Sequence, residues 1–435
     1  MARSDGVPQR GIGLALALLV VCGTLSAFLS AELGRLLLGV AGVAGWIAGL
    51  CVWSSLTTAL RAVAATLVVA GIAAGVTAEV DLARLVEQAL SQNVGILCML
   101  LSVGFLRLVS LEHPDDRPAR GLSGWWRTLL ATAVFGAVIN ISALLIIADY
   151  TRARGGGDAF TLQSLTRVFT ASAAWSPFFA GMAVVLSYVP GVSVTSLMVS
   201  ALPFALTAIA LTWAFGRFGR AAQLTEFVGF PLQPRALALP TCLALLVLAG
   251  YAVLPALPIV IVIAIALAAL ITCFSFLAYT GGPAAALATM AAHVINGMAS
   301  GRNELVLFLA AGVLSVGLGA AFDSGLVTLP DAPYTWQVAS GTLAAMLVLA
   351  VIGVHPIVTV SAMAPVLLSL SPPPLLIALT FLFVWSLGTS VSPMSATLLT
   401  VQGRYGLASW RVALANAPFA VVLYGVAVLS FFVVA

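Results

Sequence analysis

Lysine is absent from this chain, in which all 18 basic residues are arginine. Charged residues of every kind make up only 7% of the sequence, against about 25% in soluble globular domains. This scarcity excludes a soluble fold, and no hydrophilic stretch is long enough to form a separate soluble domain. The net charge of +4 comes from arginines scattered through short loops, which is typical of a topology signal and not of a nucleic-acid surface.

Several patterns that carry chemistry are also missing. The apolar runs contain no clustered carboxylates, so the sequence offers no metal site and no pair for general acid and base catalysis. The five cysteines include no Cys-x-x-Cys pair, and no phosphate-binding loop of the Walker type is present. These absences argue against ATP-driven transport by this chain alone and against a membrane-embedded enzyme, so we expect neither catalytic residues nor a metal centre.

Apolar residues, by contrast, make up 62% of the chain, and the mean hydropathy is +1.16. A helix needs about 20 apolar residues to cross the hydrocarbon of a bilayer. Runs of about this length or longer lie at residues 11–30, 36–56, 60–78, 92–110, 128–150, 163–190, 194–216, 237–255, 257–278, 303–322, 337–369, 375–402 and 411–434. The chain is therefore predicted to be an all-α polytopic membrane protein.

The positions of the arginines set the predicted orientation, because cytoplasmic loops are enriched in basic residues. With the N-terminus in the cytoplasm, the arginines that follow the run at 92–110 lie on the cytoplasmic side. If residues 128–150 crossed fully, the arginine-rich connector at 221–236 would lie outside, whereas a re-entrant hairpin keeps it inside. The same reasoning makes residues 337–369 a second re-entrant hairpin.

The predicted fold therefore has about eleven transmembrane helices and two re-entrant hairpins in an inner (plasma) membrane, with the C-terminus outside. In this topology only Arg35 and Arg84 among the arginines are left outside.

This order of elements forms two inverted-topology repeats. Residues 1–35 are the N-terminal tail and an additional first helix, 36–220 are repeat 1 (spans 2–6 with hairpin 128–150), 221–236 are the cytoplasmic connector, and 237–435 are repeat 2 (spans 7–11 with hairpin 337–369). Two sequence echoes support the repeat. The motif Leu-Ser-Val-Gly occurs at 101–104 and at 314–317, and a Ser-Pro step occurs in each half at nearly the same separation.

The two Ser-Pro steps, Ser176-Pro177 and Ser392-Pro393, lie near the middle of matching apolar runs. Proline removes a backbone donor and clashes with the preceding turn, so each helix is expected to open there. Because lipid cannot satisfy the freed carbonyls and amides, such breaks occur where protein or a polar cavity surrounds them. Paired broken helices in the two halves of a chain indicate a transport site.

Each hairpin tip adds polar groups at membrane depth, and small hydroxyl residues flank each break. The candidate substrate- and ion-binding residues are Asn140, Ser142, Ser172, Ser176, His355, Thr359, Ser390, Ser392 and Ser395, with Pro177 and Pro393 holding the helix breaks. The N-terminal ends of half helices suit an anion, while unwound carbonyls and hydroxyls suit sodium.

Each of these groups also has a structural alternative. A hydroxyl in a membrane helix can bond back to its own helix, and a lone proline can simply kink one. Asn140 and His355 can cap their hairpins instead of touching a ligand. Asp149, beside Arg152 at the mouth of the first hairpin, is expected to form a structural ion pair.

This arrangement resembles the ion transporter superfamily, which includes divalent anion/sodium symporters, citrate and arsenite permeases and the membrane subunits of TRAP transporters. The resemblance covers about residues 36–434 and lies in two inverted repeats, each with a hairpin followed by a broken helix, here at 172–181 and 388–397. It implies that substrate and ions bind between hairpin tips and breaks, and that this bundle moves like an elevator. Asn140-Ile-Ser142 partly matches the Ser-Asn-Thr tips of the divalent anion symporters, whereas His355-Pro356 departs from them.

The resulting hypothesis is a secondary active transporter, or permease, for a small organic anion, coupled to Na⁺ or H⁺. The alternative is a membrane subunit of a binding-protein-dependent, TRAP-like permease that works only with partner subunits. The expected partners are the anionic substrate and the lipid bilayer, with a homodimer left open and no nucleic acid; no cofactor is expected apart from the coupling ion. One half offers Asn140 and aromatic neighbours and the other His355 and more hydroxyls, so the two halves are expected to bind different things.

Overall fold

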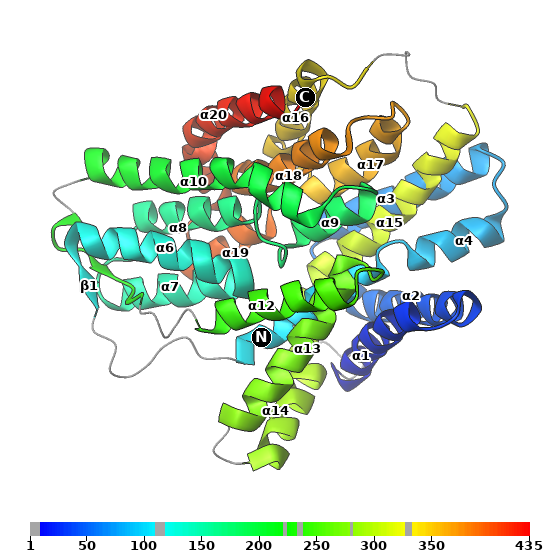
Figure 1. The fold of residues 1–435 in the computed structure, drawn as a ribbon, viewed down its shortest axis with the longest axis horizontal. Coiled ribbons are helices and arrows are strands. Elements are labelled where there is room, and N and C mark those ends of the chain that lie inside the picture. The colour runs from blue at the N-terminus through cyan, green and yellow to red at the C-terminus, as the bar shows by residue number, and fades with distance from the viewer. Residues whose placement is uncertain (1–8, 109–117, 221–223, 233–237, 279–281, 327–332) are drawn as a thin grey trace. The chain divides into compact units, whose positions relative to one another are not determined.

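The computed structural model describes residues 9–108, 118–220, 224–232, 238–278, 282–326 and 333–435, and most of them are helical (Figure 1). Among these residues, nine helices are long and apolar enough to cross a membrane. The predicted all-α, multi-pass membrane architecture is confirmed. Parts of the predicted connector, residues 221–223 and 233–236, lie outside the described residues.

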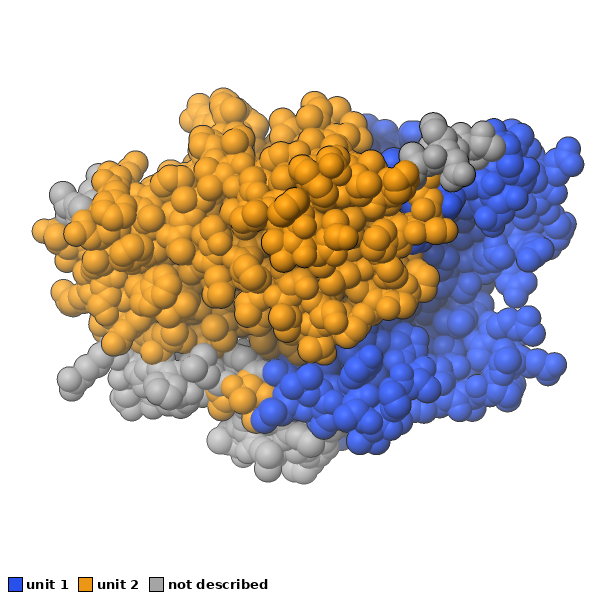
Figure 2. Space-filling view, turned by 45° about the horizontal axis from the view of Figure 1, so that its top comes forward, with its two compact units in different colours: residues 1–109, 243–330, 361–369 blue, residues 110–242, 331–360, 370–435 orange. Residues whose placement is uncertain are grey.

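The helices form two compact units, which Figure 2 colours separately. Unit 1 comprises residues 1–109, 243–330 and 361–369, and unit 2 comprises residues 110–242, 331–360 and 370–435. Each unit therefore takes helices from both halves of the chain. The two inverted repeats and their boundaries stay a prediction.

Unit 1 holds most of the predicted spans that carry neither a hairpin nor a break. Its helices are α1 (Gln9–Leu25), α2 (Ala31–Val52), α3 (Thr58–Thr77), α4 (Leu82–Ser91), α5 (Val94–Gly104), most of α12 (Ala238–Val253), α13 (Ile259–Ala278), α14 (Gly282–Asn296) and α15 (Arg302–Asp323). In the sequence, α14 falls between the predicted spans at 257–278 and 303–322, and it packs against α1 and α13. Side chains cap two of these helices, since Thr57 accepts from Leu60 N and Asp81 from Arg84 N, both at 3.3 Å.

The tightest helix crossing of unit 1 joins α3 and α15. A Cβ atom at Gly317 would lie 1.8 Å from the carbonyl oxygen of Gly71, so the two backbones approach to a distance that only glycine permits. Gly317 ends one of the two Leu-Ser-Val-Gly motifs. In this copy the motif therefore serves helix packing.

Unit 2 contains the first hairpin, the turn of the second hairpin and both breaks. Its elements are α6 (Gly121–Ile139), α7 (Ile141–Ala153), α8 (Ala159–Ser172), α9 (Ala180–Tyr188), α10 (Val194–Gly219), α16 (Trp336–Val351), the start of α17 (Pro356–Leu368), α18 (Pro374–Val391), α19 (Ala396–Tyr405), α20 (Ser409–Val434) and the antiparallel pair of β1 (Ala119–Arg120) and β2 (Val228–Gly229). Every residue of α18 from Leu376 to Val391 is buried, against α16, α20, α8 and α9. The C-terminal part of α18, with its break, is thus enclosed by protein.

The predicted helix breaks are both present. The helix α8 ends at Ser172 and α9 begins at Ala180, and α18 ends at Val391 and α19 begins at Ala396. Pro177 and Pro393 lie in the intervening non-helical segments. Proline, together with the small residues around it, has ended each helix where the sequence predicted.

The predicted hairpins are pairs of consecutive helices. The helices α6 and α7 pack against each other and turn at Asn140. The first of them begins at Gly121, ahead of the predicted start at 128, and is itself long enough to span a membrane. In the second pair, four residues from Ile352 to His355 join α16 to α17, and α16 packs against α18 and α20.

Candidate functional site

The first break contacts α6, the first helix of the first hairpin. Ser176 is fully buried and donates its hydroxyl to the carbonyl of Ala137 on α6, while its Oγ accepts from Phe178 N at 3.2 Å. Ser172, also buried, donates to the carbonyl of Ala133 on α6 at 3.2 Å and to its own helix. These two hydroxyls therefore join the first break to α6, whereas the tip residues Asn140 and Ser142 take no part in these bonds.

The tip of the first hairpin has an unusual backbone. Asn140 adopts φ +55° and ψ −142°, a conformation that costs a non-glycine residue on the order of 1–3 kcal/mol. Both Asn140 and Ser142 are half-buried, and neither side chain has a hydrogen-bond partner among the residues that the structure describes. A costly backbone conformation and two half-buried polar side chains thus coincide at this tip, and they make it a candidate for ligand contact.

The second break uses its serines differently. Ser395 caps α19 by accepting from Leu398 N at 3.3 Å, and the Ser390 hydroxyl donates back to the carbonyl of Leu387 at 2.7 Å. Ser392 is fully buried, yet its hydroxyl has no hydrogen-bond partner within the described part of the chain. A hydroxyl left in this state normally costs about 1–3 kcal/mol, so Ser392 is the strongest single candidate for contact with a bound species.

The second hairpin turn lies against the second broken helix. His355 accepts from Ile357 N at its Nδ1 atom (3.2 Å), and its ring meets that of Trp385 edge to face, with 5.7 Å between centroids. Thr359 is buried and donates to the carbonyl of Pro356 at 3.0 Å. The turn therefore faces α18, with His355 capping α17 and Thr359 bonded within that helix.

The two broken helices also cross each other. The hydroxyl of Ser386 on α18 donates to the carbonyl of Thr170 on α8 at 2.9 Å. These residues are 216 positions apart, the separation that also relates Ser176 to Ser392. The crossing thus joins positions that the predicted repeat makes equivalent.

Sequence reasoning missed a buried polar network behind the second break. Arg167 on α8 is only 5% exposed, and it donates from Nε to Asn416 Oδ1 and from Nη2 to the carbonyl of Ala415, both at 2.8 Å. Asn416 on α20 donates in turn to the carbonyl of Ser390 at 2.9 Å, close to the end of α18. The available signal was an arginine and an asparagine inside apolar runs, and neither residue was considered as a candidate in the sequence analysis.

Aromatic rings complete the surroundings of Arg167. Its guanidinium carbon lies 5.1 Å from the ring centre of Phe419 and 5.3 Å from that of Phe215. No carboxylate pairs with it in the described ranges. The charge is therefore stabilised by amide, carbonyl and aromatic dipoles, and these hold it beside the break.

Asp149 forms the predicted ion pair, and its partner is Arg404 on α19. The carboxylate also accepts from Tyr405 OH at 2.9 Å. Asp149 lies outside the candidate spans, and although burial raises the pKa of its carboxyl, the bonds from Arg404 and Tyr405 outweigh burial and hold that pKa below its usual range. The pair links the first hairpin to the half helix after the second break.

No family model matches this sequence, and neither does any curated protein. A search of solved structures finds the Alcanivorax borkumensis YdaH transporter, whose topology is described as unusual, with 16% identity and a TM-score of 0.42 over 78% of this chain and 84% of that one.

Proposed function

We propose that this protein is a secondary active transporter that moves a small organic anion across the inner membrane. The observation that carries the proposal is that one unit, unit 2, contains both helix breaks, the first hairpin and the second hairpin turn. Irregular backbone of this kind is tolerated at membrane depth only inside protein or beside a polar cavity. Two such breaks in a helical membrane protein are typical of a transport site.

An anionic substrate follows from the ends of the half helices. The helices α7, α9, α17 and α19 each begin at a hairpin turn or at a break. The first amides of a helix carry partial positive charge, so they favour a carboxylate or a similar anion. We place the substrate against Asn140 and Ser142 in one half and His355 in the other.

The coupling ion would be Na⁺ or H⁺. The Ser392 hydroxyl has no partner among the described residues, and Pro393 lacks the amide that would bond to a carbonyl one turn earlier. Together this hydroxyl and the carbonyls at the end of the broken helix offer the oxygen ligands that sodium prefers. His355 is the group that would carry a proton in the other case. In the proposed elevator mechanism, the hairpins and broken helices move together as the ion transporter superfamily resemblance implies.

Uptake by the purified chain tests this proposal. Proteoliposomes are loaded with buffer, a sodium or a proton gradient is imposed, and entry of radiolabelled carboxylates, sulfonates and oxyanions is measured. We expect gradient-dependent accumulation of at least one small anion. Absence of gradient-dependent flux for all of them would contradict an independent transporter, and flux that appears only with added partner subunits would support the TRAP-like alternative.

A further inference from the structure

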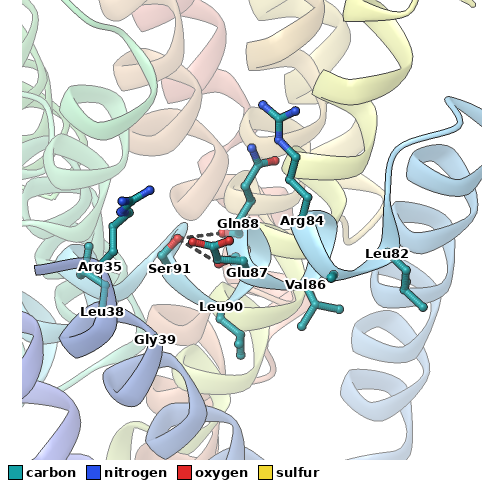
Figure 3. A pocket seen from close by; sticks show the side chains of 11 residues that line it. Arg35, Leu38, Gly39, Leu82, Arg84, Val86, Glu87, Gln88, Leu90 and Ser91 are labelled. Carbon is teal, nitrogen blue, oxygen red and sulfur yellow. Dashed lines mark hydrogen bonds between the residues drawn. The ribbon is translucent and has the colours of Figure 1, made fainter. Parts of the chain in front are cut away.

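A cavity of about 890 Å³ lies between α2 and α4 in unit 1 (Figure 3). Its polar lining consists of Arg35 on α2 and of Arg84, Glu87, Gln88 and Ser91 on α4. None of the residues of the proposed transport site lines this cavity, since all of them belong to unit 2. The cavity is therefore separate from the proposed transport site.

A second cavity of about 530 Å³ continues the first and shares Arg35, Gly39, Glu87 and Leu90 with it. Its walls are apolar side chains of α1 and α2, including Leu18, Leu36, Val40, Val43 and Ile47, which are 37–63% exposed. From Arg35 to Ile47 the groove follows α2 for about 18 Å at 1.5 Å per residue. This is close to half of the roughly 30 Å of a bilayer's hydrocarbon, and so to one leaflet.

Glycines shape the groove. A Cβ atom at Gly42 would lie 2.2 Å from the carbonyl oxygen of Leu90, so α2 and α4 approach closely there. One turn earlier, a Cβ atom at Gly39 would have no neighbour within 4 Å. The close crossing fixes the two helices, and Gly39 leaves the space beside it open.

The charged side chains that line the cavity do not neutralise one another. Arg35, Arg84 and Glu87 form no ion pair in the part of the chain that the structure describes, and the Ser91 hydroxyl bonds back to its own helix. In the view of Figure 3 the two arginines project toward the same side of the cavity, with Glu87 and Ser91 between them. These are also the two arginines that the predicted topology leaves outside, against the usual bias, so they require another reason for their position.

We propose that this groove binds a membrane phospholipid whose headgroup carries an amine. The phosphate diester lies between Arg35 and Arg84, because the planar fork of a guanidinium group donates two parallel hydrogen bonds to phosphate oxygens. The amine lies against Glu87, and one acyl chain lies on the apolar walls of α1 and α2. The polar and apolar faces of α4 suit a helix at the membrane surface, at the depth of the headgroups. The site does not depend on the proposed transport activity.

Native mass spectrometry of the full chain, purified in a mild detergent, tests the proposal. We expect phosphatidylethanolamine to remain bound, and to rebind after delipidation at least ten-fold more tightly than phosphatidylglycerol. The double variant Arg35→Gln/Arg84→Gln should lose at least ten-fold in affinity. Gly39→Leu, which fills the groove without altering a charge, should lose as much, and Glu87→Gln should remove the preference for the amine.

Two matched variants serve as controls. Arg302→Gln removes an exposed arginine of unit 1 that does not line the groove, and Gly425→Leu fills open space at an exposed glycine of α20. Both should bind phosphatidylethanolamine as the unmodified chain does. Unchanged binding by the double arginine variant and by Gly39→Leu would overturn the proposal, as would equal binding of phosphatidylglycerol or competition by inorganic phosphate at equal concentration.

Discussion

At the scale of single residues, the two Ser-Pro steps show how one motif serves two roles. The Ser176 hydroxyl bonds to α6, whereas the Ser392 hydroxyl is buried without a partner among the described residues. The difference depends on whether a neighbouring helix presents a carbonyl, which hydrophobic periodicity does not encode. Sequence reasoning could therefore select both serines as candidates, but it could not tell which hydroxyl is bonded to a neighbouring helix and which is not.

Ser392→Ala tests this distinction. Because the substitution removes a buried polar group that has no partner, we expect the free energy of unfolding to fall by less than about 1 kcal/mol. Gradient-driven uptake should fall at least ten-fold if Ser392 holds the coupling ion or the substrate. Ser430→Ala is the matched control, since that hydroxyl bonds only to its own helix at 2.9 Å. Normal uptake by Ser392→Ala would remove this residue from the site.

The network of Arg167 and Asn416 predicts a stability effect. Asn416→Ala leaves the guanidinium Nε and the Ser390 carbonyl without their partner, so we expect a loss of about 2–3 kcal/mol in the free energy of unfolding, measured by denaturation in detergent.

A double-mutant cycle with Arg167→Met should show that the two losses are not additive, because both substitutions break the same bonds. Arg411→Met, at an exposed arginine stacked on Trp410, should change stability by less than about 0.5 kcal/mol. Additive losses would show that Arg167 and Asn416 are not coupled.

At the scale of elements, the breaks and the first hairpin turn follow from local chemistry. Proline at 177 and 393 cannot continue a helix, and the turn falls at Asn140, a residue type that tolerates positive φ. Helix starts were less predictable, as the early beginning of α6 at Gly121 shows. The pairing of Arg167 with Asn416, 249 residues apart, has no local signal, because it depends on how α8 meets α20.

The ion pair between Asp149 and Arg404 connects two elements that the proposed mechanism uses, α7 and α19. Side chains at this pair are 41% and 53% exposed, so neutralising either one should change stability by less than about 1 kcal/mol. Asp149→Asn and Arg404→Gln should nevertheless change the uptake rate in the same direction, since each removes the ion pair between the first hairpin and the half helix and leaves only the bonds of Tyr405. The exchanged pair Asp149→Arg/Arg404→Asp should restore the rate.

A second ion pair of unit 2 provides the comparison. Arg220 and Asp158 lie 3.6 Å apart and join neither a break nor a hairpin turn. We expect Arg220→Gln to leave the uptake rate unchanged. If it altered the rate as much as Arg404→Gln does, the effect would reflect surface charge in general.

At the scale of the whole molecule, each compact unit draws on both halves of the chain, which a reading of the sequence in order does not reveal. Long-range packing determines this grouping, because α3 of the first half crosses α15 of the second, and α8 of the first half crosses α18 of the second. The order of elements was enough to predict a repeat, but the grouping of its parts required the contacts.

The predicted topology can be tested by accessibility. If residues 128–150 re-enter the membrane, the connector lies in the cytoplasm, and a cysteine at the exposed position Glu226, introduced in a cysteine-free background, should react with an impermeant maleimide only after the cells are opened. Alkaline phosphatase fused after Ala435 should be active, because that end is predicted outside. Labelling of Glu226→Cys in intact cells would mean that the first hairpin crosses fully. In that case the two halves of the chain would start on the same side of the membrane and have the same orientation. The prediction of an inverted repeat would then be wrong.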